Sequence, residues 1–380
     1  MKRILHITHT DVMSDSRVLK EICSLSDAGY EVSSLGVTAS EEEPRSDFFT
    51  SIKITQIKLV SRGFTFLPRS LMHVFSLFEL VAKMFLSAIR QKPDLIHCHD
   101  VLVLPLGVIV KLITRAKLVY DAHELESNRN GLSKFDGFLT LHFEKLLWKF
   151  VDALIVVSPS IDAWYQNKIG PKLSLVILNS PLNSKKSPCE SDYLRKKFLI
   201  PTDKKVFIYV GNFASGRGIE LLSQTFIHPS IDSHLVFLGY GDLADDLNQL
   251  AIRHLNIHVH DAVPHADVVS IVQSADFGLC MIENVSLSDY YCLPNKIFEY
   301  CFAGVPVLAS DFPDIRAILS EYNIGTYSSL NPVAFSEAVH LLEISNDKFK
   351  PRDLAPLSWQ MQEQKLVGLY RGLLENSIIK

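Results

Sequence analysis

The chain has 380 residues, of which 47% are hydrophobic, 21% charged and 10% aromatic. This composition supplies enough apolar side chains for two hydrophobic cores and excludes a disordered protein. The formal net charge is −4, so no overall positive charge points to nucleic acid. The charge is uneven, because residues 1–180 carry 21 Lys/Arg against 19 Asp/Glu and residues 181–380 carry 17 against 23.

The cysteines and the apolar segments indicate a cytoplasmic protein. Six cysteines are scattered without a CxxC pair, and four lie in apolar runs, which is typical of reduced, buried thiols. The first residues, MKRILHIT, have too short an apolar run for a signal peptide and alternate like a strand. Residues 67–89 are apolar but contain Arg69, Glu79 and Lys83, so we expect no membrane-spanning helix there.

In chain order, short apolar runs alternate with helical stretches over the first half. The expected strands are residues 3–8, 32–37, 53–59, 94–99, 117–121, 153–158 and 173–179. Between the first two, Val18, Ile22 and Leu25 have helical spacing and Gly29 is a good stop. Several strands are apolar throughout, which is typical of parallel strands covered on both faces.

A polar segment, residues 180–205, contains Pro181, Pro188 and Pro201 and is predicted to link two domains. The alternation then restarts, with expected strands at residues 206–210, 235–238, 257–260, 277–281 and 305–309. A last helix is expected at 358–374. The predicted fold is therefore α/β, with two doubly wound, Rossmann-like domains facing across a cleft. The domains are 1–182 and 183–355, and the C-terminal helix, 356–380, crosses back to the first.

Ligands of such sheets bind at the carboxyl ends of the strands, so we consider the residues that follow each strand. The first strand is followed by His9-Thr10-Asp11 and then by Ser14-Asp15-Ser16-Arg17, without the GxGxxG of dinucleotide dehydrogenases. Ser14 and Asp15 either cap the next helix or form part of an anion site at its N-terminus, with Arg17 assisting.

Two clusters of histidine and aspartate follow the next strands of the first half. They are His97-Cys98-His99-Asp100 and Asp121-Ala122-His123-Glu124, and His and Asp at strand ends suit acid/base work or hydroxyl binding. A helix cap is the alternative for Asp100, and His97 is expected to be structural. No further ligands at metal-type spacing follow, so no metal site is predicted.

Glycine turns and one dense polar cluster mark the strand ends of the second half. Gly211 and Asn212 lead to Arg217, and Gly239-Tyr240-Gly241 forms a second turn. Such glycines let backbone N–H groups approach phosphates, and arginine binds phosphates bidentately. Pro294 begins a helix whose first residues, Asn295 and Lys296, face an anion, while the Glu299 carboxylate can accept hydrogen bonds from a ribose diol.

These motifs together resemble the family 4 retaining glycosyltransferases of the GT-B fold. The similar segments are SDSRVLKEICSLSDAGYEV, VYDAHEL, SADFGLCMIEN, LPNKIFEYCFAGVPVLASD and SWQMQEQKLVGLYRGLL. The resemblance implies that Glu299 binds the donor ribose, Arg217 the diphosphate, and Asn295 and Lys296 the phosphates or sugar. It also implies that His123 faces the donor sugar.

The sequence departs from the family's pattern at two positions. Tyr291 stands where the first glutamate of the Glu-x7-Glu motif is expected, with Glu283 or Asp289 as alternative contacts to the donor sugar. Asn212 stands where a basic residue is common. The loop with Asp11, Ser14 and Arg17 is assigned to the acceptor side.

The resemblance implies transfer of a sugar from a UDP- or GDP-sugar to a saccharide or lipid-linked saccharide acceptor, with retention of configuration, in cell-surface polysaccharide or glycoconjugate biosynthesis. His123 and Asp100 are the expected catalytic residues. Without a DxD motif at a strand end, Arg217, Lys296 and helix N-termini would neutralise the leaving diphosphate without a metal. No other cofactor and no nucleic-acid partner is expected.

Two other functions stay open, a nucleotide-sugar 2-epimerase and a non-catalytic nucleotide-sugar-binding protein. The position of the chain relative to membranes also has two interpretations. The segment 67–92 combines Phe66, Leu67, Leu71, Phe75, Phe78, Ala82, Phe85 and Leu86 with Arg69, Lys83, Arg90 and Lys92. It is either a core-facing helix or a segment that lies on the anionic inner face of a membrane.

Overall fold

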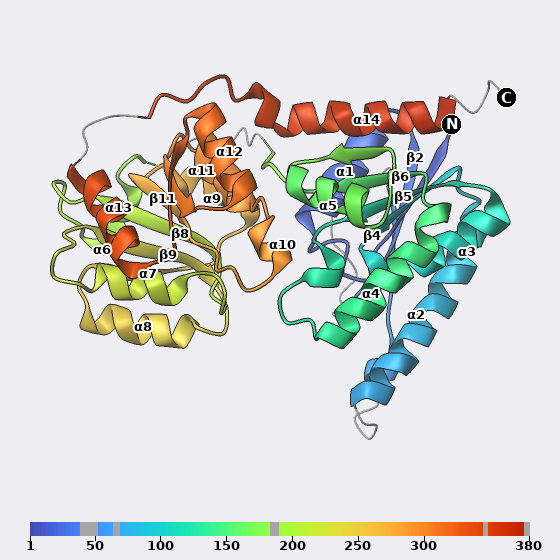
Figure 1. The fold of residues 1–380 in the computed structure, drawn as a ribbon, viewed down its shortest axis with the longest axis horizontal. Coiled ribbons are helices and arrows are strands. Elements are labelled where there is room, and N and C mark those ends of the chain that lie inside the picture. Colours follow the sequence, from blue (N-terminus) through green and yellow to red (C-terminus); the bar gives the residue numbers. More distant parts are fainter. Residues whose placement is uncertain (39–51, 64–68, 183–189, 345–348, 376–380) are drawn as a thin grey trace. The chain divides into compact units, whose positions relative to one another are not determined.

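The computed structural model describes residues 1–38, 52–63, 69–182, 190–344 and 349–375 (Figure 1). The chain divides into two compact units, Met1–Ile177 with Gln362–Lys380, and Leu178–Met361. Each unit contains one parallel sheet with helices, which confirms the predicted pair of doubly wound domains. Predictions for Phe66, Leu67, Pro188 and Cys189 lie outside the described residues.

The first unit contains a seven-stranded parallel sheet of order β3-β2-β1-β4-β5-β6-β7. Its strands are β1 (Arg3–Ile7), β2 (Glu31–Val37), β3 (Lys53–Ile57), β4 (Leu95–His99), β5 (Lys117–Ala122), β6 (Ala153–Val156) and β7 (Ser174–Val176). All seven were predicted, with boundaries a few residues too long in places. The chain direction across the sheet reverses between β1 and β4, and such switch points are where open α/β sheets bind ligands.

Helices cover both faces of this sheet. They are α1 (Ser16–Asp27), α2 (Arg69–Gln91), α3 (Leu104–Thr114), α4 (Lys134–Leu147), α5 (Pro159–Lys168) and the C-terminal α14 (Trp359–Glu375). Because parallel crossovers are right-handed, α1 covers one face and α2 to α5 cover the other. The α14 helix lies on the face of α1, where the rings of Tyr370 and Tyr30 are 6.5 Å apart.

The second unit contains a six-stranded parallel sheet of order β10-β9-β8-β11-β12-β13, with its switch point between β8 and β11. Its strands are β8 (Val206–Asn212), β9 (His234–Tyr240), β10 (Ile257–Asp261), β11 (Phe277–Cys280), β12 (Val307–Ser310) and β13 (Gly325–Ser328). The first five were predicted. The edge strand β13 was not, because the sequence GTYS is short and has no apolar run.

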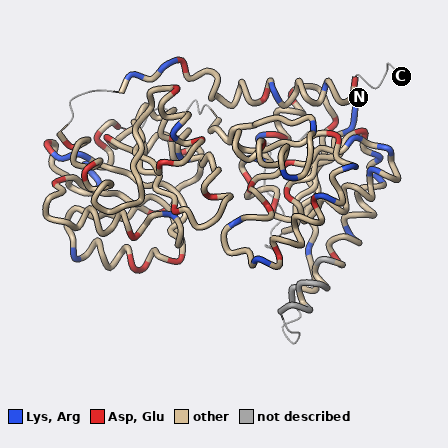
Figure 2. The backbone as a smooth tube through the Cα atoms, in the orientation of Figure 1, with Lys and Arg blue, Asp and Glu red and all other residues tan. Residues whose placement is uncertain are grey.

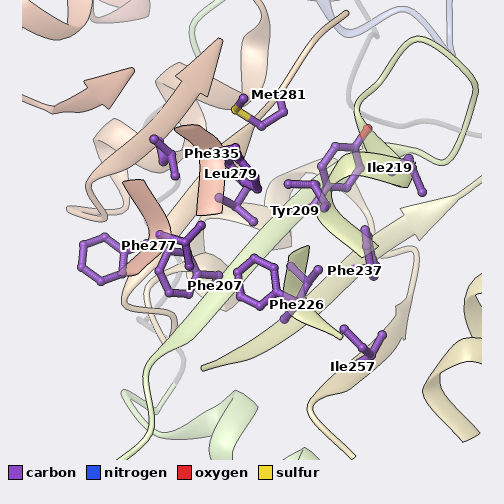
Figure 3. Packing of buried hydrophobic residues seen from close by; sticks show 14 of the residues in the cluster. Phe207, Tyr209, Ile219, Phe226, Phe237, Ile257, Phe277, Leu279, Met281 and Phe335 are labelled. Atoms are coloured by element: carbon purple, nitrogen blue, oxygen red, sulfur yellow. The ribbon is translucent and has the colours of Figure 1, made fainter. Parts of the chain in front are cut away.

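The helices of the second unit alternate with its strands. They are α6 (Tyr193–Phe198), α7 (Ile219–Phe226), α8 (Ala244–Arg253), α9 (His265–Val272), α10 (Leu287–Tyr290), α11 (Asn295–Phe302), α12 (Pro313–Tyr322) and α13 (Pro332–Ile344). An aromatic core that includes Phe207, Phe226 and Phe237 supports β8 and its neighbours (Figure 3). Burying each such ring contributes about 1.5–3 kcal/mol, so the loops at these strand ends rest on a rigid support.

Two further predictions concern the cysteines and the absence of a membrane-spanning helix. The five cysteines in the described ranges are free, and Cys98, Cys280 and Cys301 are buried. No described helix is long and apolar enough to cross a membrane.

Candidate active site

In the second unit, the ends of β8 and β9 approach each other where the sequence has glycine. A Cβ atom on Gly239 would lie 1.9 Å from the carbonyl oxygen of Gly211, so only glycine fits. The side chain of Lys296 reaches the same point from α11. Its Nζ would lie 3.5 Å from a Cβ on Gly211 and is 3.8 Å from the centroid of the Tyr209 ring. The end of β8 and the start of α11 therefore form one cationic corner.

The first turn of α11 adds backbone donors to this corner. Pro294 is the N-cap and makes no side-chain cap bond, so its side chain does not cover the first N–H groups of the helix, which carry the positive end of the helix dipole. Glu299 follows one turn later and is buried, with its Oε1 3.0 Å from the Nε2 of His265. This carboxylate next to a cationic corner is suited to binding a sugar hydroxyl beside a phosphate.

Arg217 belongs to the same cluster. Burial raises the pKa of the Cys280 thiol at the end of β11 to about 11, while the charges of Lys296 and Arg217 lower it and that of Glu299 raises it. The three charged groups therefore lie near the Cys280 thiol at the carboxyl end of β11. Asn212 lies at the same sheet edge, where its Oδ1 would be 2.4 Å from a Cβ on Gly241.

The alternative donor-sugar contacts already have partners within the protein. Glu283 accepts a hydrogen bond from the Gly218 N–H at 3.3 Å. Asp289 accepts one from the Ser286 hydroxyl and lies 3.6 Å from Arg217. The ring of Tyr291 lies 5.4 Å from that of Tyr290. Glu283 and Asp289 thus position the loop that carries Arg217.

In the first unit, the structure brings His9, Asp100 and His123 together at the ends of β1, β4 and β5. The Asp100 carboxylate lies between the two histidines, 3.8 Å from the Nδ1 of His9 and 3.9 Å from the Nδ1 of His123. The Nε2 of His123 is 3.1 Å from the Oδ2 of Asp121 and 3.1 Å from the Nδ1 of His99. The imidazole of His123 is 18% exposed, so it connects this buried network with the surface.

Asp100 has an unusual backbone. Its φ of 68° lies in the region that favours glycine, and its side chain makes no helix-cap bond. The helix-cap interpretation is therefore wrong. The Asp100 N–H donates to the carbonyl of Asp121 at 2.9 Å, which holds the strained residue in place. Backbone strain of this kind is frequent at active sites.

Replacing Asp100 with Gly is expected to separate stability from activity. Glycine relieves a strain of about 1–3 kcal/mol but adds freedom to the unfolded chain, so the free energy of unfolding should change by about 1 kcal/mol or less. Catalytic activity should fall because the carboxylate beside His123 is lost. Asn323→Gly, at another non-glycine position with positive φ, is the control that should keep full activity. An active Asp100→Gly variant would contradict the assignment.

The segment around the start of α1 differs from its prediction at Arg17, in the first turn of the helix. This side chain is 3% exposed and donates from Nε and Nη2 to both oxygens of Asp121, at 3.1 and 3.0 Å. Its Nη1 donates to the carbonyl of Ile177 at 2.9 Å. The expectation that Arg17 assists an external anion is therefore wrong, because the guanidinium is bound within the protein by the buried aspartate on β5 and by the carbonyl of Ile177.

The rest of this segment is held by internal bonds. Asp15 caps α1, as predicted, by accepting from the N–H groups of Arg17 and Val18. Ser14 is not the cap, because its hydroxyl donates to the carbonyl of Asp11 at 2.9 Å. The Asp11 carboxylate accepts from the Met13 N–H and the Gln56 amide. Asp11 and Ser14 therefore shape the turn after β1.

The Arg17–Asp121 ion pair and its neighbour His123 determine one another's protonation states. Burial would raise the pKa of Asp121, but Arg17 and His123 outweigh it and hold the pKa well below its ordinary value. Burial would likewise lower the pKa of His123, but Asp121 and Asp100 raise it to about 10. At neutral pH the structure thus places a cationic imidazole at the end of β5.

The positive charge of His123 makes the free energy of unfolding depend on pH. Because the pKa of His123 is higher in the folded protein than its ordinary 6.5, the protonated imidazole stabilises the fold. The contribution is complete below pH 6.5 and is lost as the pH rises toward 10. The free energy of unfolding of wild type should exceed that of His123→Gln most at pH 6.5, and the difference should shrink toward pH 10. A difference independent of pH would contradict this charge assignment.

Three more histidines lie behind His123 in the core. His97 is buried, as predicted, and His6, His97 and His99 stack with ring centroids 4.2–5.2 Å apart and interplanar angles of 19–30°. Burial is the main reason that the pKa values of all three lie below 6.5. With Glu21, they bring ligand-type atoms within 4.8 Å of one another.

The stacking of the three histidine rings distinguishes between a metal centre and a hydrogen-bonded network. The lone pairs of imidazole lie in the ring plane, so nearly parallel, stacked rings cannot all point at one ion about 2.0 Å from each nitrogen. His6 Nδ1 and His99 Nε2 are instead 3.0 Å apart, at hydrogen-bond distance. His97 Nδ1 bonds to the Tyr370 hydroxyl of α14. The geometry favours a hydrogen-bonded network over a metal centre.

The sequence prediction missed His6, Glu21, Tyr370 and, in the second unit, His265. The sequence does contain a signal for His6 and Glu21. Side chains alternate along a strand, which places His6, and Glu21 lies one helical turn after Arg17. His6 pairs with His97 and His99 pairs with Asp121 in the sheet register. These four side chains therefore share the face that α1 covers. Tyr370 and His265 are too distant in sequence from their partners to leave such a signal.

Comparison with known proteins gives consistent matches over both units. Residues 16–179 match Glycosyltransferase Family 4 and residues 204–343 match Glycosyl transferases group 1. The chain is 26% identical over 247 residues to an uncharacterized glycosyltransferase of Methanocaldococcus jannaschii, covering 60% of each chain.

Two further matches cover more of the chain. A chitobiosyldiphosphodolichol beta-mannosyltransferase of Kluyveromyces lactis is 22% identical over 359 residues, 84% of this chain and 77% of that protein. An Anabaena protein solved with UDP and glucose superposes with a TM-score of 0.74 at 16% identity, over 98% of this chain and all of that one. The structural match establishes the shared fold.

Proposed function

The chain belongs to the group 1, family 4-type glycosyltransferases of the GT-B fold, and from this premise we propose that it transfers a hexose from a nucleotide sugar to a saccharide or lipid-linked saccharide. The observation that carries the proposal is the cationic corner beside Glu299. Lys296, Arg217 and the start of α11 provide positive charge for a diphosphate, and Glu299 provides a carboxylate for the ribose.

The proposed donor is a UDP- or GDP-sugar. A diphosphate fits the paired cations, and the Anabaena protein of the same fold binds UDP. We propose that Arg217 and Lys296 neutralise the leaving diphosphate without a metal ion or other cofactor. In this proposal Glu283 and Asp289 act on the donor through Arg217 and its loop, and Tyr291 replaces the missing carboxylate.

The proposed reaction retains the configuration of the transferred sugar. The bond from the anomeric carbon to the phosphate oxygen breaks, and the acceptor hydroxyl forms its bond on the same face. The hydroxyl proton passes to an oxygen of the leaving phosphate. We assign to His123 a contact with the donor sugar, with its charge held by Asp121 and Asp100.

The proposed setting is the cytoplasmic face of a membrane, in the synthesis of a cell-surface polysaccharide or glycoconjugate. The mannosyltransferase relative is named for a lipid-diphosphate acceptor, which supports a lipid-linked saccharide as the acceptor class. In this proposal the first unit, with the turn that Asp11 and Ser14 form, selects the acceptor.

A panel of nucleotide sugars tests the proposal. Release of nucleoside diphosphate should occur with one donor, should rise with a lipid or saccharide acceptor, and should fall in Glu299→Ala and His123→Ala. Conversion of the donor to its 2-epimer without an acceptor would instead identify an epimerase. Donor binding without any turnover would identify a non-catalytic binding protein. Equal turnover in wild type and both variants would refute the assigned site.

A further inference from the structure

The helix α4 exposes its apolar face. Five large hydrophobic side chains point to solvent, namely Phe135 (68% exposed), Phe138 (56%), Leu139 (38%), Phe143 (53%) and Leu146 (62%). Their spacing of three, four, eight and eleven residues from the first places them on one side of the helix. A helix that covers a core would bury this stripe.

The side of α4 that faces the sheet is small and polar instead. Glu144 is fully buried and accepts hydrogen bonds from the hydroxyls of Tyr120 and Tyr165, at 2.8 and 2.6 Å. Gly137 lies so close to the Ser127 carbonyl that a Cβ would be 2.5 Å from its oxygen. These contacts fix the rotation of α4, so the exposure of its stripe is built into the fold.

The neighbouring helices repeat the pattern. Exposed hydrophobic side chains on α3 are Ile109, Leu112 and Ile113, and those on α2 are Phe75, Phe78 and Leu86. The helices α2 and α3, and α3 and α4, are in contact on one face of the first sheet (Figure 1). Eleven of the 26 large hydrophobic side chains that are exposed in the described ranges belong to these three helices. We call these eleven residues the α2–α4 face.

The charges around the α2–α4 face are mostly positive (Figure 2). Arg90 on α2, Lys134 and Lys145 on α4 and Lys149 just beyond it are exposed. Lys83 on α2 is also exposed, but it forms an ion pair with Glu79. Among the described, exposed side chains of the three helices, Asp136 is the one carboxylate. An open cavity of about 870 Å³ beside α2 extends the positive rim, because its lining includes Lys53, Lys83 and Arg90.

We propose that the α2–α4 face docks on an anionic phospholipid bilayer. The apolar stripes would enter the boundary between headgroups and acyl chains, and the lysines and arginines would meet lipid phosphates. A second copy fits less well, because a two-fold contact would place this positive rim against itself. The proposal deepens the proposed function by bringing the enzyme to a lipid-linked acceptor, but lipid binding itself requires no turnover.

Sedimentation of the full chain with vesicles tests the proposal. Wild type should bind vesicles of phosphatidylcholine with phosphatidylglycerol better than phosphatidylcholine alone, and added salt should weaken the binding. The double variant Phe138→Ser/Phe143→Ser should reduce binding about tenfold or more, and Lys145→Glu/Lys149→Glu should remove the preference for phosphatidylglycerol. Ile252→Ser/Leu255→Ser, at residues 83% and 91% exposed in the second unit, should bind like wild type.

Three results would overturn the proposal. They are absence of wild-type binding to both kinds of vesicle, equal binding by wild type and Phe138→Ser/Phe143→Ser, and a wild-type dimer that this variant converts to a monomer. Thermal melting checks that each variant is folded. Release of nucleoside diphosphate with a soluble donor is measured in parallel, so that a failure of transferase activity is distinguished from a failure of lipid binding.

Discussion

Replacing Arg17 with Met should destabilise the protein by about 3–5 kcal/mol, the cost of breaking a buried ion pair by removing one partner. Arg17 makes two hydrogen bonds to the Asp121 carboxylate and lies 3.2 Å from Glu21. Without the guanidinium, the buried Asp121 carboxylate would lose these two hydrogen bonds and would keep its ion pair with His123. Urea unfolding of wild type and variant, followed by fluorescence, measures the difference.

Two control variants make this prediction specific. Arg316→Met removes an exposed ion pair with Asp311, and such pairs contribute little, so its free energy of unfolding should stay close to wild type. Adding Asp121→Asn to Arg17→Met should recover part of the lost stability, because it removes the buried carboxylate that has lost its arginine partner. An Arg17→Met variant as stable as Arg316→Met would contradict the buried ion pair.

Replacing His123 with Ala should lower the kcat of sugar transfer by about 100- to 10,000-fold, the range for loss of a side chain that handles protons or charge at a reaction centre. Donor affinity should largely persist, because Lys296, Arg217 and Glu299 belong to the other unit. Initial rates at saturating donor, with a binding titration, separate the two effects. His340→Ala on α13, where the imidazole is 58% exposed, is the matched control. Full kcat in His123→Ala would contradict the assignment.

The sequence alone predicted most of the strands because their apolar runs are local signals. The grouping of polar side chains at the start of α11 was also predictable, because Asn295, Lys296 and Glu299 lie within two helical turns. The Arg17–Asp121 ion pair could not be predicted, because 104 residues separate its partners. In addition, the polar residues at the start of α1 are compatible both with an anion site and with a helix cap. Only the register of β1, β4 and β5 shows that these polar side chains share one buried face.

The rotation of α4 shows a second limit of sequence analysis. An apolar stripe at helical spacing normally predicts a core-facing side. Here Glu144 has two buried phenol partners and Gly137 allows close packing, so the polar and small side faces the sheet. These partners lie on β5, on α5 and in the loop before α4, and only the fold places them together.

Titration with nucleoside diphosphates tests the central claim, that the donor binds at the cationic corner beside Glu299. Calorimetry with UDP and GDP compares wild type, Glu299→Gln and the control Glu337→Gln on the exposed side of α13. Wild type and Glu337→Gln should bind one of the two nucleotides with the same Kd. Glu299→Gln should bind it about 10- to 100-fold more weakly, the cost of losing hydrogen bonds to a charged acceptor. Equal Kd values for wild type and Glu299→Gln would contradict the donor site.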